Sequence, residues 1–173
     1  MTIGYQSPAG NAMPVRPDEF GPYRFALETL EGCLDEVKPL HAAHWAETEM
    51  YRHGLEMNPD YPRVIRSEQA GFFRQYTMRV KETGELVGAC GLYLMPSTHT
   101  QKLVAQEDSI FVKEEHRGRA AMAFIRYMED CLWDAGAMEI RMHSKTTNRV
   151  GKLLEFIGFS HVANLYVKVR SCP

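Results

Sequence analysis

The residues from Glu107 to Ala135 constrain the fold of this chain more than any other part of its sequence. A β-rich segment that carries two acids leads into a short charged turn with one glycine, Gly118, and small residues then begin a helix. The apolar side chains of that helix recur at helical spacing and share one face: Phe124, Met128, Cys131, Leu132 and Ala135. Gly136 is placed to end the helix. The pattern predicts a strand, a turn and an amphipathic helix in direct succession.

The turn has the composition of an anion-binding site. The first amides of a helix lack an internal partner and carry about half a positive charge. Gly118 lets the backbone approach an anion closely, and Ala120 and Ala121 add no bulk there. Arg117 and Arg119 supply fixed charge and forked donors suited to phosphate. The turn therefore predicts a pyrophosphate site, although an ordinary loop with solvated arginines fits the same residues.

A second segment near the C-terminus has clear signals for the start and end of a helix. Thr146 and Asn148 have side chains that can cap free helix amides. The expected apolar face consists of Val150, Leu153, Leu154 and Ile157. Gly158 ends this helix, and an extended tail from Phe159 through Val169 is expected after it.

These two segments resemble the GNAT superfamily of N-acetyltransferases. Its acyl-CoA-binding signature is Gln or Arg, two residues, Gly, one residue, then Gly or Ala. The similar run here is Glu115-His116-Arg117-Gly118-Arg119-Ala120, which departs from the signature at Glu115. The segment from Asn148 to Phe159 resembles the family's asparagine-helix-Gly-Phe segment. Many members carry a tyrosine four residues before that Gly, where it can protonate the departing thiolate. This chain has Leu154 at that position, so Tyr166 or a water remains for the role.

The resemblance implies an α/β chain with the GNAT fold, a mixed and mostly antiparallel central sheet flanked by helices. It implies acetyl-CoA as cosubstrate, with the cofactor's pyrophosphate at Arg117, Gly118, Arg119, Ala120 and Ala121. A splayed strand pair in that fold receives the pantetheine arm. We therefore expect main-chain contacts from Ile110, Phe111 and Val112 and a side-chain contact from Asn148. A bulge in the strand of Ile110 would explain the splay and free an amide to polarise the thioester carbonyl.

Acetyl transfer to an amine also needs a base, because an alkylammonium is charged at neutral pH. Asp108 and Glu107 lie just upstream of the predicted pyrophosphate site, where the family commonly keeps such a group. Strand alternation sends the two side chains to opposite faces, so only one is expected to reach the substrate. We expect Asp108 to be that base and Glu107 to be the alternative, although a solvated acid at a strand end also fits Asp108. His99 and His143 are weaker candidates.

The rest of the sequence predicts one domain behind a short arm. Residues 1–21 are rich in Pro and Gly without a clear period, which predicts a flexible N-terminal arm, and residues 22–173 are expected to form a single acetyltransferase domain. Strands are expected at 24–30, 72–81, 86–95, 101–112 and 139–143, with a hairpin turn around Gly84. A helical region is expected at 34–53, kinked or restarted at Pro39, and a loop with a short helical piece at 54–71.

Composition excludes several classes of protein. A net charge of −2 and a pI near 6.4 provide no basic field for nucleic acid. No apolar run approaches the ~20 residues of a membrane span, and the N-terminus lacks signal-peptide features, so a cytoplasmic protein is expected. The four cysteines show no paired spacing, which argues against a zinc site or disulfide framework. His41, His44 and Glu47 lack an evident further ligand, so no metal is expected.

The leading hypothesis is an acetyl-CoA-dependent N-acetyltransferase that acetylates a primary amine of a small molecule or a protein by direct attack. The closest resemblance is to small bacterial and bacteriophage members. The alternative is a non-catalytic GNAT-fold protein that binds acyl-CoA as a regulatory ligand, which Leu154 favours. A nucleic-acid base as acceptor is disfavoured by the pI. The sequence leaves the acceptor and the oligomeric state open, and a homodimer is compatible with it.

Overall fold

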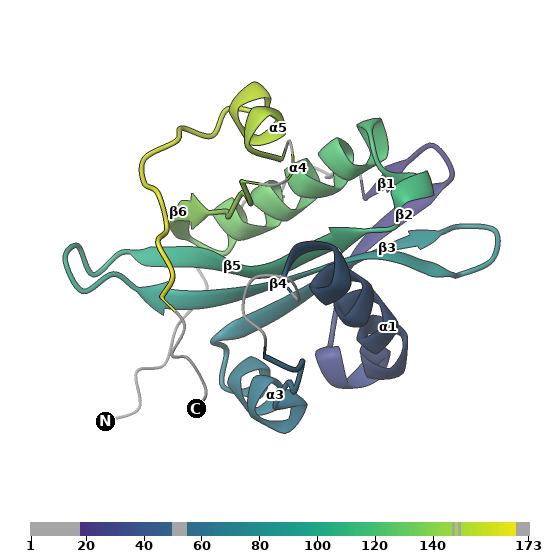
Figure 1. Cartoon of the computed structure of the whole chain (residues 1–173), viewed down its shortest axis with the longest axis horizontal. Coiled ribbons are helices and arrows are strands. Elements are labelled where there is room, and N and C mark those ends of the chain that lie inside the picture. The colour runs from purple at the N-terminus through teal and green to yellow at the C-terminus, as the bar shows by residue number, and fades with distance from the viewer. Residues whose placement is uncertain (1–17, 50–54, 147, 149, 169–173) are drawn as a thin grey trace, which may run out of the picture.

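One mixed sheet forms the centre of the protein, and helices cover both of its faces (Figure 1). The computed structural model describes residues 18–49, 55–146, 148 and 150–168. The elements in chain order are β1 (Glu19–Phe20), β2 (Tyr23–Glu28), α1 (Leu30–Thr48), α3 (Tyr61–Gln69), β3 (Phe73–Val80), β4 (Leu86–Pro96), β5 (Leu103–Val112), a 3₁₀ turn (Glu114–His116), α4 (Arg119–Asp134), β6 (Ala137–Arg141) and α5 (Val150–Phe156).

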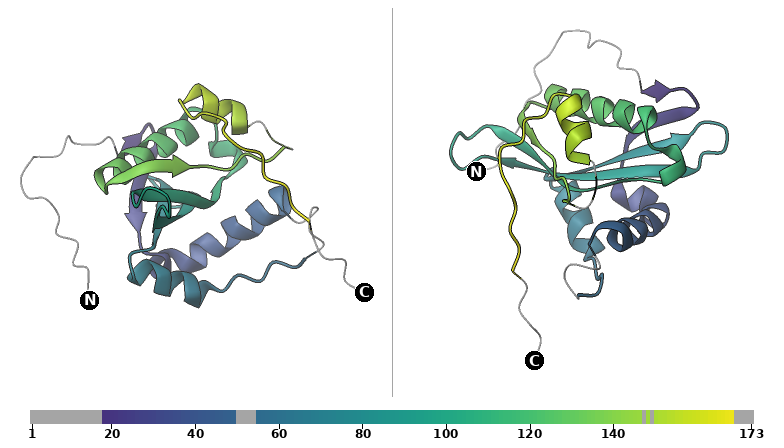
Figure 2. Two further views of the ribbon diagram at one scale, coloured as in Figure 1. Left: turned by 90° about the vertical axis from the view of Figure 1, so that its left-hand side faces the viewer. Right: turned by 45° about the horizontal axis from the view of Figure 1, so that its top comes forward.

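The six strands lie side by side in sequence order, from β1 to β6. Neighbours from β1 to β5 are antiparallel, and β5 and β6 are parallel because α4 connects them across the sheet. Helices α1 and α3 cover one face, and α4 and α5 lie on the other (Figures 1 and 2). The expected α/β architecture with a mixed, mostly antiparallel sheet is confirmed.

Each face of the sheet has its own apolar core. The predicted apolar face of α4 is buried at Phe124, Met128, Cys131 and Leu132, and it packs against side chains of β2 to β5. The other core joins α1 to the sheet through Leu30, Cys33, Val37, Leu40, Phe73, Leu86 and Ala89. Both cores bury β4, whose small Gly91 leaves room for the ring of Phe73: an added Cβ would lie 2.6 Å from that ring.

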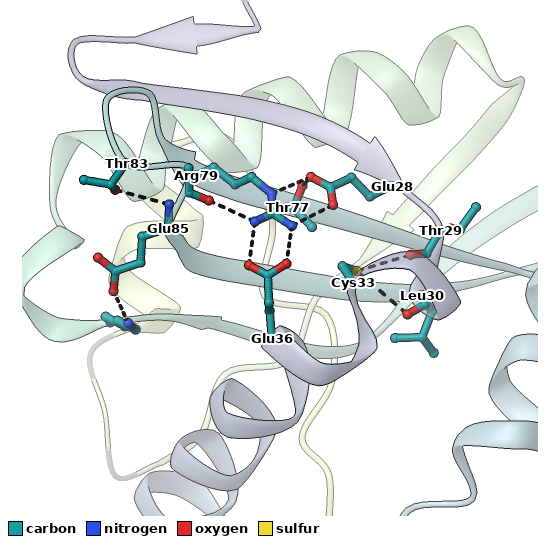
Figure 3. A network of polar contacts seen from close by, with 11 residues as sticks. Glu28, Thr29, Leu30, Cys33, Glu36, Thr77, Arg79, Thr83 and Glu85 are labelled. Carbon is teal, nitrogen blue, oxygen red and sulfur yellow. Dashed lines mark hydrogen bonds and ion pairs between the residues drawn. The ribbon is translucent and has the colours of Figure 1, made fainter.

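A polar network fixes α1 to the strands beside it (Figure 3). The Arg79 guanidinium of β3 donates to both carboxylate oxygens of Glu28 in β2, at 2.8 and 2.9 Å. It also donates to both oxygens of Glu36 in α1, at 2.7 and 3.0 Å, and to the Gly84 carbonyl at 2.9 Å. Thr77 donates to Glu28 at 2.8 Å. The Glu28 and Glu36 carboxylates and the Gly84 carbonyl together accept all five N–H groups of the Arg79 guanidinium, which is the most that an arginine side chain can donate.

Several element boundaries differ from those expected from the sequence. The strand expected at 24–30 is β2, and it ends at Glu28. The Thr29 hydroxyl accepts a hydrogen bond from the Gly32 amide and caps α1, which begins at Leu30. Pro39 lies inside α1 without ending it. The segment expected to be mostly loop contains the nine-residue α3, which Asp60 caps.

The C-terminal part also differs from its expected form. The strand expected at 139–143 runs from Ala137 to Arg141, so His143 lies beyond it. The described tail, residues 159–168, belongs to no strand and runs from α5 past the edge of the sheet toward the side of α1 and α3 (Figure 2). Of the expected arm, residues 1–17 lie outside the described residues, and Glu19 and Phe20 pair with β2. The domain boundary at residue 22 stays a prediction.

Candidate active site

The strands β5 and β6 separate midway along β5. Their parallel pairing ends at Gln106 and Arg141, whereas β5 stays paired with β4 as far as Val112. On the edge of β5 that faces β6, residues 107–112 therefore have no strand partner. A register shift lies at the same point, because Leu92 is opposite Glu107 and Gly91 is opposite Ser109, which leaves Asp108 without a partner. This is the bulge that the sequence analysis expected, and it bends the bulged strand where the two strands part.

The start of α4 confirms the predicted strand, turn and helix. Gly118 precedes the helix with φ +79° and ψ −131°, a conformation that strongly favours glycine. The first helical hydrogen bond runs from the Met122 amide to the Gly118 carbonyl at 3.2 Å, and no side chain caps the helix start. The amides of Arg119, Ala120 and Ala121 are thus the unpaired first amides of a helix. A Cβ on Gly118 would meet nothing within 4 Å, so the space in front of the turn is open.

The two arginines of the turn lie in different surroundings. Arg117 folds back: its Nε donates to the Val112 carbonyl at 2.8 Å, and its Nη2 lies 2.6 Å from a carboxylate oxygen of Glu47. Its guanidinium also lies 5.4 Å from the centre of the Phe111 ring. Arg119 is exposed at the first position of α4. The charge of Arg117 is therefore shared with α1, and Arg119 is the freer of the two.

The C-terminal end of α1 lies between the two sides of the splay. Glu47 pairs with Arg117 on the α4 side, and Glu49 pairs with Lys145, which follows β6. Sequence reasoning did not find these pairs, because the partners of the first are 70 residues apart and share no local pattern. The His44 ring of α1 lies edge-on to Phe111, with ring centroids 6.2 Å apart, and burial lowers the pKa of His44.

Glu107 and Asp108 have different environments, as expected for adjacent strand residues. Glu107 is 5% exposed and accepts two hydrogen bonds from His143, from the backbone N–H at 3.0 Å and from Nδ1 at 2.9 Å. Asp108 is exposed as a residue, yet nearby protein partly desolvates its carboxyl group, and this raises its pKa. The charge of Glu107 raises the Asp108 pKa further, while His143 and Arg63 oppose the shift.

Asp108 faces the side of the sheet that α1 and α3 cover. Burial raises the pKa of Tyr93, and the charge of Asp108 raises it further. Arg63 of α3 opposes this shift. Tyr93 itself packs beside Phe73 with ring centroids 5.1 Å apart. A carboxyl group with a raised pKa near a tyrosine, on the open side of a bulge, is suited to receive a proton from an amine.

Comparison with known proteins shows the family of the chain. The model of the acetyltransferase (GNAT) family matches residues 35–153, more than half of the chain. The chain belongs to the GNAT family. A comparison with curated protein sequences gave no match.

Solved structures agree with this family. A ribosomal-protein-alanine N-acetyltransferase from Brucella melitensis biovar Abortus 2308 is 25% identical, with a TM-score of 0.65 over 86% of this chain and 99% of that one. AAC(6')-Iy, in complex with a CoA bisubstrate analogue, is 15% identical, with a TM-score of 0.61 over 87% and 99% of the two chains. An aminoglycoside acetyltransferase from a soil metagenomic sample is 13% identical, with a TM-score of 0.67 over 86% and 97%. The last two show the fold alone, and with the family match the comparisons identify this GNAT protein as an N-acetyltransferase.

The segment from Asn148 to Phe159 contains the start of α5 and the helix itself. The Asn148 side-chain oxygen accepts the Val150 amide at 3.1 Å, so this residue caps the start of α5. Leu154 is 6% exposed and belongs to the apolar underside of α5, where it has no proton to give. Tyr166 lies in the extended tail and is 89% exposed.

Among the residues that the structure describes, no group of three His, Cys, Asp or Glu side chains could hold a metal ion. Within the same ranges, every helix is too short or too polar to cross a membrane.

Proposed function

We propose that this GNAT protein transfers the acetyl group of acetyl-CoA to a primary amine of a small molecule or a protein, by direct attack of the amine on the thioester. The observation that carries the proposal is the splay itself. It combines a bulge at Asp108, an unpaired edge of β5 and a helix start with free amides, all within one stretch of chain.

The cofactor is proposed to bind along this stretch. Its pyrophosphate meets the turn of Arg117, Gly118, Arg119, Ala120 and Ala121, where free amides and the helix dipole favour an anion. Its pantetheine arm runs along the unpaired edge, with main-chain contacts to Ile110, Phe111 and Val112. Asn148 contacts the arm from the start of α5. An amide freed by the bulge is aimed at the thioester oxygen and stabilises its developing negative charge.

Asp108 is proposed as the base. It lies at the bulge on the side of α1 and α3, and its raised pKa suits a group that must take a proton near neutral pH. The alternative, Glu107, is buried and already accepts two bonds from His143, which leaves it less free to meet an amine.

The acceptor is proposed from chemistry and from related proteins. The similar solved structures include a ribosomal-protein-alanine N-acetyltransferase and an aminoglycoside acetyltransferase, so both a protein and a small molecule are represented among the named acceptors. The proposed acceptor is therefore a primary amine of either class. The enzyme itself is proposed to be cytoplasmic and to have no nucleic-acid partner. A second candidate function is non-catalytic binding of acyl-CoA, which the buried Leu154 favours, because the usual tyrosine acid is missing.

Release of free thiol from acetyl-CoA across a panel of amines and peptides tests the proposal. Asp108→Asn should keep acetyl-CoA affinity and lower turnover by about 10²–10⁴-fold, the usual contribution of a general base. Asp130→Asn, an exposed change on α4, is the matched control and should leave both unchanged. A wild-type protein that binds acetyl-CoA tightly but acetylates nothing on a broad panel would favour the regulatory function.

A further inference from the structure

The point where β5 and β6 separate is closed by a side-chain pair. Glu107 is the first residue of β5 beyond the last paired residue, Gln106, and His143 lies two residues beyond the last paired residue of β6. The carboxylate of Glu107 accepts both the backbone N–H and the Nδ1–H of His143. The pair thus replaces the strand pairing that stops one residue earlier, and it fixes the imidazole at the apex of the splay.

We propose that His143 is the acid that protonates the departing CoA thiolate, and that Glu107 is the residue that positions and charges its ring. This inference rests on the proposed acetyl transfer. It assigns the role that Leu154 leaves open, since a buried leucine cannot give a proton.

The geometry leaves one nitrogen of the ring for this work. Nδ1 is bound to Glu107, so Nε2 is the atom that can give a proton. The His143 side chain is 46% exposed, whereas the Glu107 side chain is 5% exposed, so the ring is accessible and the carboxylate is buried. The Gln106 amide nitrogen lies 3.4 Å from Nε2 and also donates to the Glu107 carbonyl at 3.4 Å. For Nε2 to carry the proton, this amide has to turn over so that its oxygen faces the ring.

The charges around His143 favour its protonated form. The hydrogen bond to Glu107 raises the pKa of His143, partial burial opposes the rise, and the charge of Lys145 opposes it as well. His143 lowers the pKa of Asp108, so the carboxylate of Asp108 and a positive His143 ring attract each other. Glu49, which pairs with Lys145, limits the opposing effect of that lysine. The Glu107 carboxylate therefore favours the protonated ring, and burial and Lys145 oppose it.

The step balances without a further reactant. The amine nitrogen bonds to the carbonyl carbon, the C–S bond breaks, and its electron pair goes to sulfur. The Nε2–H proton then moves to that sulfur and leaves a neutral ring. Over the reaction the ammonium nitrogen loses two protons, one of which restores the imidazolium through solvent while the other is released. Transfer from the ring to the thiolate is favourable as long as the raised pKa of His143 stays below that of a thiol, which is ordinarily about 8.5.

The test measures turnover against pH for wild type, His143→Gln, Glu107→Gln and His161→Gln, together with acetyl-CoA affinity and the His143 titration by NMR. His143→Gln should lower turnover by about 10²–10⁴-fold, keep acetyl-CoA affinity within threefold and lose the alkaline limb of the profile. Glu107→Gln should shift that limb and the NMR titration of His143 to lower pH, a change that a merely structural role would not produce. His161→Gln, an exposed histidine of the tail, should match wild type.

Each arm can overturn the inference. If folded His143→Gln turns over within threefold of wild type, His143 is not the acid. If His143→Gln loses the acidic limb of the pH profile rather than the alkaline limb, His143 is the base. If His143→Gln does not fold, the wild-type titration still decides, because a His143 pKa at or below about 6.5 contradicts the proposal. A wild type that binds acetyl-CoA but acetylates no amine overturns the proposed function itself, and this inference with it.

Discussion

The guanidinium of Arg117 and the carboxylate of Glu47 form an ion pair 2.6 Å long that joins the basic turn before α4 to the end of α1. The turn is therefore less positive than its sequence suggests, because one of its two arginines is partly neutralised from within the protein.

Removing the carboxylate of Glu47 should make the turn a better anion site. Glu47→Gln is expected to tighten CoA binding by about threefold at low ionic strength, and the gain should shrink at high salt because exposed charges are screened. Glu31→Gln, at the other end of the same helix, is the control and should change little. Calorimetric titration with CoA at two salt concentrations measures both. Equal affinities of Glu47→Gln and wild type at low salt would mean that Arg117 is not part of the phosphate site.

Gly118 is expected to be needed for the cofactor more than for the fold. Gly118→Ala places a methyl group in the open space before the helix start and strains the backbone by about 1–3 kcal/mol. We expect at least a tenfold loss of CoA affinity. Gly84→Ala is a matched control, since Gly84 also has positive φ (+73°) and open space around it but lies in the β3–β4 turn. Both changes should lower the free energy of unfolding similarly, and only Gly118→Ala should affect CoA. Similar affinities of the two variants would remove the turn from the cofactor site.

Two substitutions at Asn148 should separate its capping role from its proposed contact with pantetheine. Asn148→Ser keeps a side-chain oxygen that can accept the Val150 amide, but it removes the amide donor. It should leave the free energy of unfolding nearly unchanged and weaken acetyl-CoA binding roughly three- to tenfold, the value of one neutral hydrogen bond. Asn148→Ala should lower both. If Asn148→Ser binds acetyl-CoA as wild type does, the residue is only a helix cap.

The Arg79 network should determine part of the acid stability. Hydrogen bonds from Arg79 lower the pKa values of Glu28 and Glu36 in the folded protein. A lowered folded pKa contributes stability that is present above the unfolded value of about 4.3 and is lost as pH falls through the folded value. Arg79→Met should therefore lower the free energy of unfolding at pH 7 and flatten its decline below about pH 4.5. Urea denaturation between pH 3 and 7 measures this, with Arg141→Met, which removes an exposed pair, as the control. Parallel pH curves for Arg79→Met and wild type would contradict the prediction.

Much of the fold could be predicted from local patterns in the sequence. The strand, glycine turn and helix around Gly118 follow from the positions of apolar and small residues over a few turns of chain, and the structure confirms them. The hairpin around Gly84 follows in the same way from a turn between two β-rich runs. The family resemblance rested on the same short segments, and the family match confirms it. Such features depend on neighbours in sequence, so a sequence can specify them.

The tertiary structure decided how these pieces meet. The sequence placed Glu107 and His143 in two separate strands, whereas the structure ends the pairing of β5 and β6 just before Glu107 and brings His143 onto it across 36 positions. It also turned Arg117 toward Glu47, 70 positions away. Hydrogen bonds and ion pairs between distant residues depend on strand register and on where a bulge falls. A shift of one residue exchanges the faces of every side chain, and no local pattern fixes that register.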